Sequence, residues 1–161
     1  MSDLALAVDI GGTKMAAGLV DRDGTLLHRN HVPTRKTPAA EGGAAGEAAE
    51  LLWSDLAALV EGVVLHSDGR PVVVCGVGCG GPMQPGGEGV SPLNIPAWRD
   101  FPLRSRLSEL SGLPTYVDND AKALAVAEGW LGAAKECDNF IGMVVSTGVG
   151  GGIVLNGRLL E

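Results

Sequence analysis

The chain has 161 residues, of which 45% are hydrophobic and 19% charged, so we expect a folded protein with a buried core rather than a disordered segment. Its formal net charge of −7 comes from 12 basic and 19 acidic residues, and no run of Lys or Arg occurs. Nucleic acid and anionic membrane surfaces are therefore disfavoured as partners, and a bound anion must be held mainly by backbone amides, helix ends or a metal ion.

The sequence gives no sign of membrane insertion or secretion. No apolar stretch is long enough to cross a bilayer, and the N-terminus has no basic leader with a small-residue cleavage site. The three cysteines, Cys75, Cys79 and Cys137, form no CxxC pair. We therefore expect free thiols in a cytoplasmic protein, with a zinc site as the less favoured alternative.

The predicted elements begin with an antiparallel meander of strands at 4–9, 15–20 and 25–32, separated by tight turns. Apolar residues at helical spacing predict a helix over 44–65. The remaining predicted elements are a strand at 72–75, an irregular stretch from Gly76 to Asp100, a helix from Pro102 to Ser111, a strand at 115–117, a helix at 120–134 and strands at 140–146 and 152–155. The order is β-β-β-α-β-α-β-α-β-β.

The last two strands repeat the pattern of the first two, because each pair flanks a polar, Gly-rich turn. This similarity indicates an internal duplication. We therefore expect a first domain over 1–120. Residues 121–161 would supply a linking helix and the first hairpin of a second domain, cut off at Glu161.

The turn from Asp9 to Lys14 is the first candidate site. Gly11 and Gly12 have no Cβ and permit positive φ, so consecutive amides can point at an oxyanion, while Thr13 adds a hydroxyl and Lys14 a cation. Asp9, at the strand end, could hold Mg²⁺ through water. The alternative is a hairpin turn with no chemical role. The turn is not a P-loop, because GxxxxGK[ST] is absent and a strand is predicted to follow.

The segment Ser146-Thr147-Gly148-Val149-Gly150-Gly151-Gly152 is the second candidate. It holds more glycines than a hairpin needs, which predicts room for a ligand. Two such turns could clamp a polyphosphate from both sides.

The segment Gly76-Val77-Gly78-Cys79-Gly80-Gly81 satisfies the dinucleotide fingerprint GxGxxG. Pro82 and Pro85 follow it, however, so the helix that would receive a pyrophosphate is missing. Dinucleotide binding is therefore disfavoured.

Asn94, Trp98, Asn119 and Asp120 offer amides, an indole and a carboxylate, which is the lining that a polyhydroxyl ligand needs. Asp120 also lies at the start of a predicted helix, and helix capping is the favoured role when it is considered alone. The three histidines have no partner spacing and receive no role.

Five segments together resemble the ROK family (repressor, open reading frame, kinase) of the superfamily that joins sugar kinases, actin and the heat-shock chaperone ATPases. They are DIGGTK at 9–14, GVGCGGP at 76–82, NIPAW at 94–98, DND at 118–120 and STGVGGGIVLNGRL at 146–159. The resemblance covers essentially the whole chain. It is closest to the glucokinase-like members, because no helix-turn-helix precedes Leu4. It implies an α/β, ribonuclease-H-like actin/hexokinase ATPase domain and the start of a second, duplicated domain.

The activity that this resemblance implies is ATP-dependent phosphorylation of a hexose, with Asp120 as the general base and Mg²⁺ bound to Asp9 through water. The implied phosphate-binding residues are Asp9, Gly11, Gly12, Thr13, Lys14, Ser146, Thr147, Gly148, Gly150 and Gly151. The implied sugar-binding residues are Gly80, Gly81, Asn94, Asn119 and Asp120.

Two features depart from the family pattern. Lys122 replaces the Asn that usually follows Asn-Asp-Ala, and we expect it to alter packing or charge rather than chemistry. The Glu-x-x-His sugar-binding segment and the His/Cys motif of the family's structural zinc are absent, so the chain should be the N-terminal portion of a kinase, with little or no activity alone. The resemblance suggests a homodimer or homotetramer for full-length forms. A non-catalytic sugar-binding or regulatory protein is the alternative, and the sugar, and ATP against polyphosphate as donor, stay open.

Overall fold

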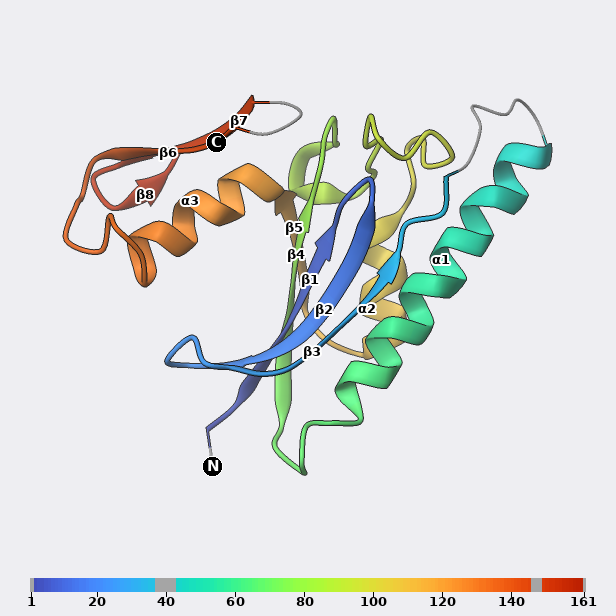
Figure 1. Cartoon of the computed structure of the whole chain (residues 1–161), viewed down its shortest axis with the longest axis horizontal. Coiled ribbons are helices and arrows are strands. Elements are labelled where there is room, and N and C mark those ends of the chain that lie inside the picture. The colour runs from blue at the N-terminus through green and yellow to red at the C-terminus, as the bar shows by residue number, and fades with distance from the viewer. Residues whose placement is uncertain (1, 37–42, 146–148, 161) are drawn as a thin grey trace. The chain divides into compact units, whose positions relative to one another are not determined.

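A computed structural model describes residues 2–36, 43–145 and 149–160. The chain divides into two compact units, Met1–Val117 and Asp118–Glu161 (Figure 1). The elements are β1 (Leu4–Ile10), β2 (Lys14–Asp21), β3 (Leu26–Pro33), α1 (Gly43–Val64), β4 (Val72–Cys79), the 3-10 helix η1 (Pro85–Gly87), α2 (Leu103–Ser111), β5 (Thr115–Asn119), α3 (Asp120–Trp130), β6 (Phe140–Val145), β7 (Val149–Leu155) and β8 (Arg158–Leu159). The predicted order of strands and helices is confirmed, with η1 and β8 added.

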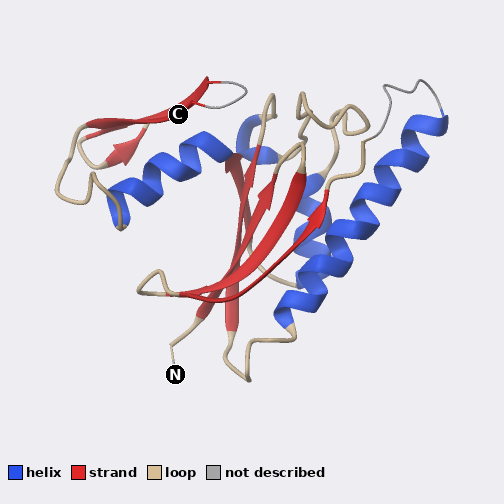
Figure 2. Cartoon of the chain, in the orientation of Figure 1, coloured by secondary structure: helices blue, strands red, loops and turns tan. Residues whose placement is uncertain are grey.

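A five-stranded mixed sheet in the order β3-β2-β1-β4-β5 forms the centre of the first unit (Figure 2). The predicted meander is confirmed, since β1 pairs antiparallel with β2 and β2 with β3. Strand β4 runs parallel to β1, with Asp9 beside Gly78 and Ile10 beside Cys79. Because parallel strands end at the same edge of a sheet, the turn after β1 and the loop after β4 leave from neighbouring positions.

The core of the first unit lies between this sheet and the helices α1 and α2, which cover the same face (Figure 1). In β1 every second residue is buried, from Leu4 to Ile10, as the period of a strand requires. Helix α1 contributes buried residues at helical spacing, namely Leu52, Leu56, Leu59, Val60 and Val63. Each fully buried side chain of this size stabilises the fold by roughly 1.5–3 kcal/mol relative to exposure.

Strand β4 is longer than the sequence indicated. We expected a strand at 72–75 and an irregular stretch from Gly76, but the strand continues to Cys79. The glycines weaken the local preference for a strand, yet residues 76–79 pair in register with residues 7–10 of β1. The pairing with β1 therefore outweighs the weak strand preference of the glycines. Between β4 and α2 the chain forms only the 3-10 helix η1 and no α-helix, as the argument against a dinucleotide site required.

The second unit consists of α3 and the three-stranded sheet β6-β7-β8. Helix α3 ends at Trp130 rather than near 134. The predicted turn through Gly152 is also wrong in extent, because β7 begins at Val149 and its glycines pair with β6, Val144 opposite Gly150 and Gly142 opposite Gly152.

These strand glycines let α3 approach the sheet closely. A Cβ on Gly150 would lie 2.8 Å from Cβ of Ala121, and a Cβ on Gly142 or Gly152 would lie 2.7 Å from Cβ of Ala125. Such contacts are far shorter than van der Waals separation. Gly150 and Gly152 therefore have a packing function that does not depend on any ligand.

In the part of the chain that the structure describes, no helix combines the length and the apolar character that crossing a membrane requires.

Candidate active site

The predicted phosphate turn is a tight connection between β1 and β2. The amide of Gly11 donates a hydrogen bond to the carbonyl of Lys14, at 3.0 Å. Gly11 and Gly12 are partly exposed, and the side chains of Asp9, Thr13 and Lys14 are exposed. The turn therefore presents a hydroxyl, a cation and backbone at the carboxyl edge of β1, and a strand rather than a helix follows it.

Thr34, which the sequence did not single out, is hydrogen-bonded to two carbonyl groups of this turn. It follows β3, is only 6% exposed, and donates from Oγ1 to the carbonyl of Gly11 at 2.7 Å. Its amide donates to the carbonyl of Thr13 at 3.0 Å. A threonine after Pro33 carries no sequence signal for this function, because the contact spans 23 residues along the chain.

Asn94 lies against the same turn. A Cβ built on Gly12 would come within 2.4 Å of Cβ of Asn94, so residue 12 has room for hydrogen only. The structure therefore brings together the predicted phosphate turn and one predicted sugar-binding residue, which are 82 residues apart in a sequence of 161. Asn94 itself is exposed, as a ligand-binding amide must be.

The loop that carries Asn94 is fixed by two neighbouring side chains. Nη1 of Arg99 lies within hydrogen-bonding distance of three carbonyl oxygens, of Pro92 at 3.2 Å, Ile95 at 3.1 Å and Trp98 at 2.6 Å. Trp98 is fully buried and stacks on Phe101, with ring centroids 4.4 Å apart. The expected role of Trp98 as an aromatic beside a sugar is therefore wrong: its ring belongs to the core.

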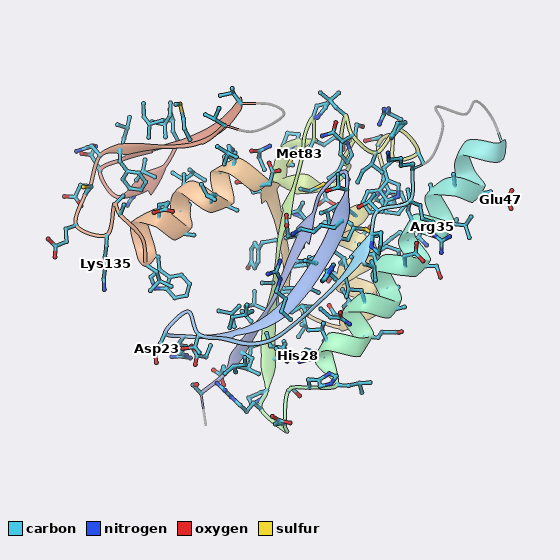
Figure 3. All side chains as sticks on the ribbon, in the orientation of Figure 1. Asp23, His28, Arg35, Glu47, Met83 and Lys135 are labelled. Carbon is cyan, nitrogen blue, oxygen red and sulfur yellow. The ribbon has the colours of Figure 1, made fainter. Side chains whose placement is uncertain are left out.

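Gly80 and Gly81 follow β4 directly and join the same group of loops. The peptide bond between Gly81 and Pro82 is cis. The carbonyl of Gly81 accepts from the amide of Leu93 at 3.3 Å, and that of Pro82 accepts from Ser91 at 2.8 Å. The segment from Gly80 to Pro82 is thus hydrogen-bonded to the residues just before Asn94. Figure 3 labels Met83, the next residue of this loop.

In the second unit, Asn119 and Asp120 begin α3. Asn119 is the N-cap, and its Oδ1 accepts from the amides of Ala121 at 3.0 Å and Lys122 at 3.4 Å. Asp120 lies in the first turn, is exposed, and accepts from the Ala121 amide at 2.9 Å through Oδ1. Capping is therefore carried out mainly by Asn119. Lys122 forms an ion pair with Asp118 at 3.4 Å, one turn away. The expectation that Lys122 alters packing or charge rather than chemistry stays a prediction.

Of the second predicted phosphate turn, Ser146, Thr147 and Gly148 lie outside the described residues. Gly150 and Gly151 are described and lie in β7. Their predicted contact with phosphate stays a prediction.

Asp9 has the chemistry that a magnesium ion requires. Mg²⁺ keeps several waters in proteins and binds through one or two carboxylates together with substrate phosphates. Asp9 offers an exposed carboxylate at the strand edge from which the glycine turn departs. Among the described residues, no three His, Cys, Asp or Glu side chains gather to form a larger metal site. A magnesium ion held by Asp9 through water is therefore compatible with the residues present.

A five-stranded sheet with helices on one face, a glycine turn after its first strand and a glycine loop after the parallel neighbour define the α/β fold of the actin/hexokinase-like ATPases. The ROK family model matches residues 5–161. The chain belongs to the ROK family, which confirms the resemblance seen in the five sequence segments.

Curated proteins similar to this chain include sugar kinases. The chain is 36% identical over 156 residues to a glucokinase of Streptomyces coelicolor, which covers 97% of this chain and 45% of that protein. It is 37% identical over 155 residues to an N-acetylmannosamine kinase of Escherichia fergusonii, which covers 96% of this chain and 48% of that one.

Solved structures agree with the fold. A ROK family glucokinase from Streptomyces griseus, solved in complex with glucose and AMPPNP, matches with a TM-score of 0.80 at 36% identity, over 98% of this chain and 46% of that one. The chain therefore spans a little under half the length of the curated relatives and of this solved protein.

Proposed function

We propose that this chain carries the phosphate-binding turn and sugar-binding residues of an ATP-dependent hexose kinase. The observation that supports the proposal is the close approach of Gly12 to Asn94, because Gly12 belongs to the proposed phosphate turn and Asn94 is a proposed sugar-binding residue. Phosphoryl transfer needs the donor phosphate and the acceptor hydroxyl at neighbouring positions. The names of the relatives support the same reaction class.

In this proposal the amides of the Gly11–Lys14 turn and the Lys14 ammonium bind the terminal phosphates of ATP, and the segment Ser146–Gly151 is the second proposed phosphate-binding segment. Asp9 would hold Mg²⁺ through water, which supplies charge neutralisation at the phosphates. Asn94, Gly80, Gly81 and Asn119 would bind sugar hydroxyls.

Asp120 is the proposed general base, which accepts the proton of the attacking hydroxyl. Its carboxylate is exposed, and one oxygen is held by the Ala121 amide at 2.9 Å. This bond restrains the carboxylate at the start of α3. A carboxylate restrained in this way can take a proton from a hydroxyl that lies within hydrogen-bonding reach.

Asp120→Asn tests the base directly. We expect kcat to fall by a factor on the order of 10² to 10⁴, because an amide cannot accept the proton, whereas sugar binding changes little. The assay is coupled glucose phosphorylation by a chimera in which a ROK glucokinase supplies the part of the relatives that this chain lacks. Unchanged turnover would remove Asp120 from this role.

The 161-residue chain alone should phosphorylate sugars slowly or not at all, since it spans under half of its relatives. Brisk turnover by the isolated chain would contradict this expectation.

Calorimetry with glucose, N-acetylmannosamine and ATP, together with the turnover assay of the chimera, distinguishes a kinase from a non-catalytic sugar-binding protein. Sugar binding without turnover in the chimera favours the non-catalytic protein.

A further inference from the structure

The feature that carries a further inference is the pair of hydrogen bonds from Thr34 to the phosphate turn. Thr34 is a polar residue with only 6% of its surface exposed. Its hydroxyl binds the carbonyl of Gly11 at 2.7 Å and its amide binds the carbonyl of Thr13 at 3.0 Å. Thr34 thus binds the carbonyls of Gly11 and Thr13, the first and third residues of the Gly11–Lys14 turn.

These bonds decide where the amides of the turn point. In a trans peptide the C=O of one residue and the N–H of the next point in opposite directions. The only cis peptide in the described part of the chain is Gly81-Pro82, so the peptides after Gly11 and Thr13 are trans. Holding these two carbonyls toward Thr34 therefore turns the amides of Gly12 and Lys14 the other way.

Without that restraint a Gly-Gly turn has wide conformational freedom, because neither residue has a Cβ to limit its dihedrals. Thr34 is itself anchored through the next residue. Arg35 makes a bidentate ion pair with Asp55 of α1, with Nη2 to Oδ1 at 2.9 Å (Figure 3 labels Arg35). The turn is thus connected to the long helix through two successive residues.

We propose that Thr34 is a positioning residue of the phosphate turn: by holding the carbonyls of Gly11 and Thr13 it keeps the amides of Gly12 and Lys14 directed at a bound polyphosphate. The inference rests on the proposed function, since it assumes that this turn binds phosphate.

The variants are Thr34→Val, which removes the hydroxyl at nearly constant shape, and Thr34→Ser, which keeps it. Thr34→Ala replaces Thr34→Val if valine disturbs folding. Thr115→Val is the matched control, because Thr115 is also buried, at 9% exposure, and its Oγ1 donates to the carbonyl of Leu113 at 3.0 Å in the same unit.

The measurement is a titration of the isotope-labelled 161-residue chain with magnesium tripolyphosphate, followed at the backbone amides by NMR. In the wild-type chain the Gly12 and Lys14 resonances should shift saturably. Thr34→Val should raise the apparent Kd by about tenfold, the equivalent of one lost hydrogen bond, while Thr34→Ser and Thr115→Val stay within about twofold of wild type.

The hydroxyl acts on one peptide only, which provides a second readout. Thr34→Val leaves the bond from its own amide to Thr13 intact, so in the tripolyphosphate complex the protection of the Gly12 amide from hydrogen exchange should fall more than that of the Lys14 amide. A purely structural effect would lower protection throughout the first unit, and Thr115→Val would reproduce it.

Two results would overturn the inference, and they are distinguishable. If wild type and Thr34→Val bind tripolyphosphate equally, or if Thr115→Val weakens binding as much, Thr34 does not position the turn although the phosphate site stands. If the Gly12 and Lys14 resonances of wild type do not respond to tripolyphosphate at millimolar concentrations, the phosphate site itself is refuted, and the role of Thr34 with it.

Discussion

Neighbouring residues at the start of α3 have separate tasks. Asn119 caps the helix through Oδ1, and Asp120 exposes its carboxylate in the first turn. An acidic group is favoured there by the partial positive charge of the helix N-terminus. The capping oxygen of Asn119 is already engaged, so its side-chain NH₂ is the group that remains suited to a sugar hydroxyl.

A second consequence at the residue scale concerns Cys75. Burial raises the pKa of this thiol to about 11, from an ordinary value of 9.0, although its hydrogen bond with Thr115 acts in the opposite direction. The folded chain therefore holds this proton more tightly than the unfolded chain does. Its contribution to stability is fully present below about pH 9 and is lost as the pH rises towards 11.

We therefore expect the free energy of unfolding to fall more steeply between pH 9 and 11 in wild type than in Cys75→Ala. Urea titrations across this range measure the difference, and comparison with the variant removes every contribution that the two proteins share. Parallel curves for the two proteins would show that Cys75 does not titrate as its burial requires.

At the scale of elements, α3 depends on glycines in its neighbouring strands. Gly142→Ala would place a Cβ 2.7 Å from Cβ and 2.8 Å from Cα of Ala125. We expect a destabilisation of about 1–3 kcal/mol, typical of overpacking, seen as faster hydrogen exchange across α3. Gly62→Ala, in α1 with nothing within 4 Å, is the control and should stabilise its helix by roughly 0.5–1 kcal/mol. Unchanged protection of α3 in Gly142→Ala would refute this packing role.

These glycines show which part of the structure the sequence could predict. Apolar periodicity and turn residues were sufficient for the element order, because they are local signals. The same composition could not show which residue each glycine lies against: Gly12 lies against Asn94, a proposed sugar-binding residue, while Gly150 and Gly152 lie against α3. That distinction depends on which element packs against the glycine in the folded chain, and the sequence of a single strand does not specify that element.

The candidate site shows the same limit. The Asp9–Lys14 turn and Asn94 were predictable as motifs, and their contact is now observed. Thr34 and the strand character of Gly76 to Cys79 were not predictable, because both depend on partners in distant segments, on Gly11 and on β1. Trp98 was misassigned because an indole beside Asn94 in a predicted irregular stretch gives no indication of its burial.

At the scale of the whole molecule, the residues proposed for the reaction are divided between the two compact units: the phosphate turn lies in Met1–Val117 and the proposed base in Asp118–Glu161. Within the first unit, the close approach of Gly12 to Asn94 joins the proposed phosphate turn to the loop that carries a proposed sugar-binding residue.

Gly12→Ala tests this connection most directly. The new Cβ would lie 2.4 Å from Cβ of Asn94, so it must displace the phosphate turn and the loop that carries Asn94 together. Gly76→Ala is the control, since a Cβ there meets nothing within 4 Å in the same sheet. Calorimetric titration of both variants and wild type with Mg-ATP and with glucose should show both affinities weakened at least about tenfold in Gly12→Ala and unchanged in Gly76→Ala. Wild-type affinity of Gly12→Ala for both ligands would contradict the account.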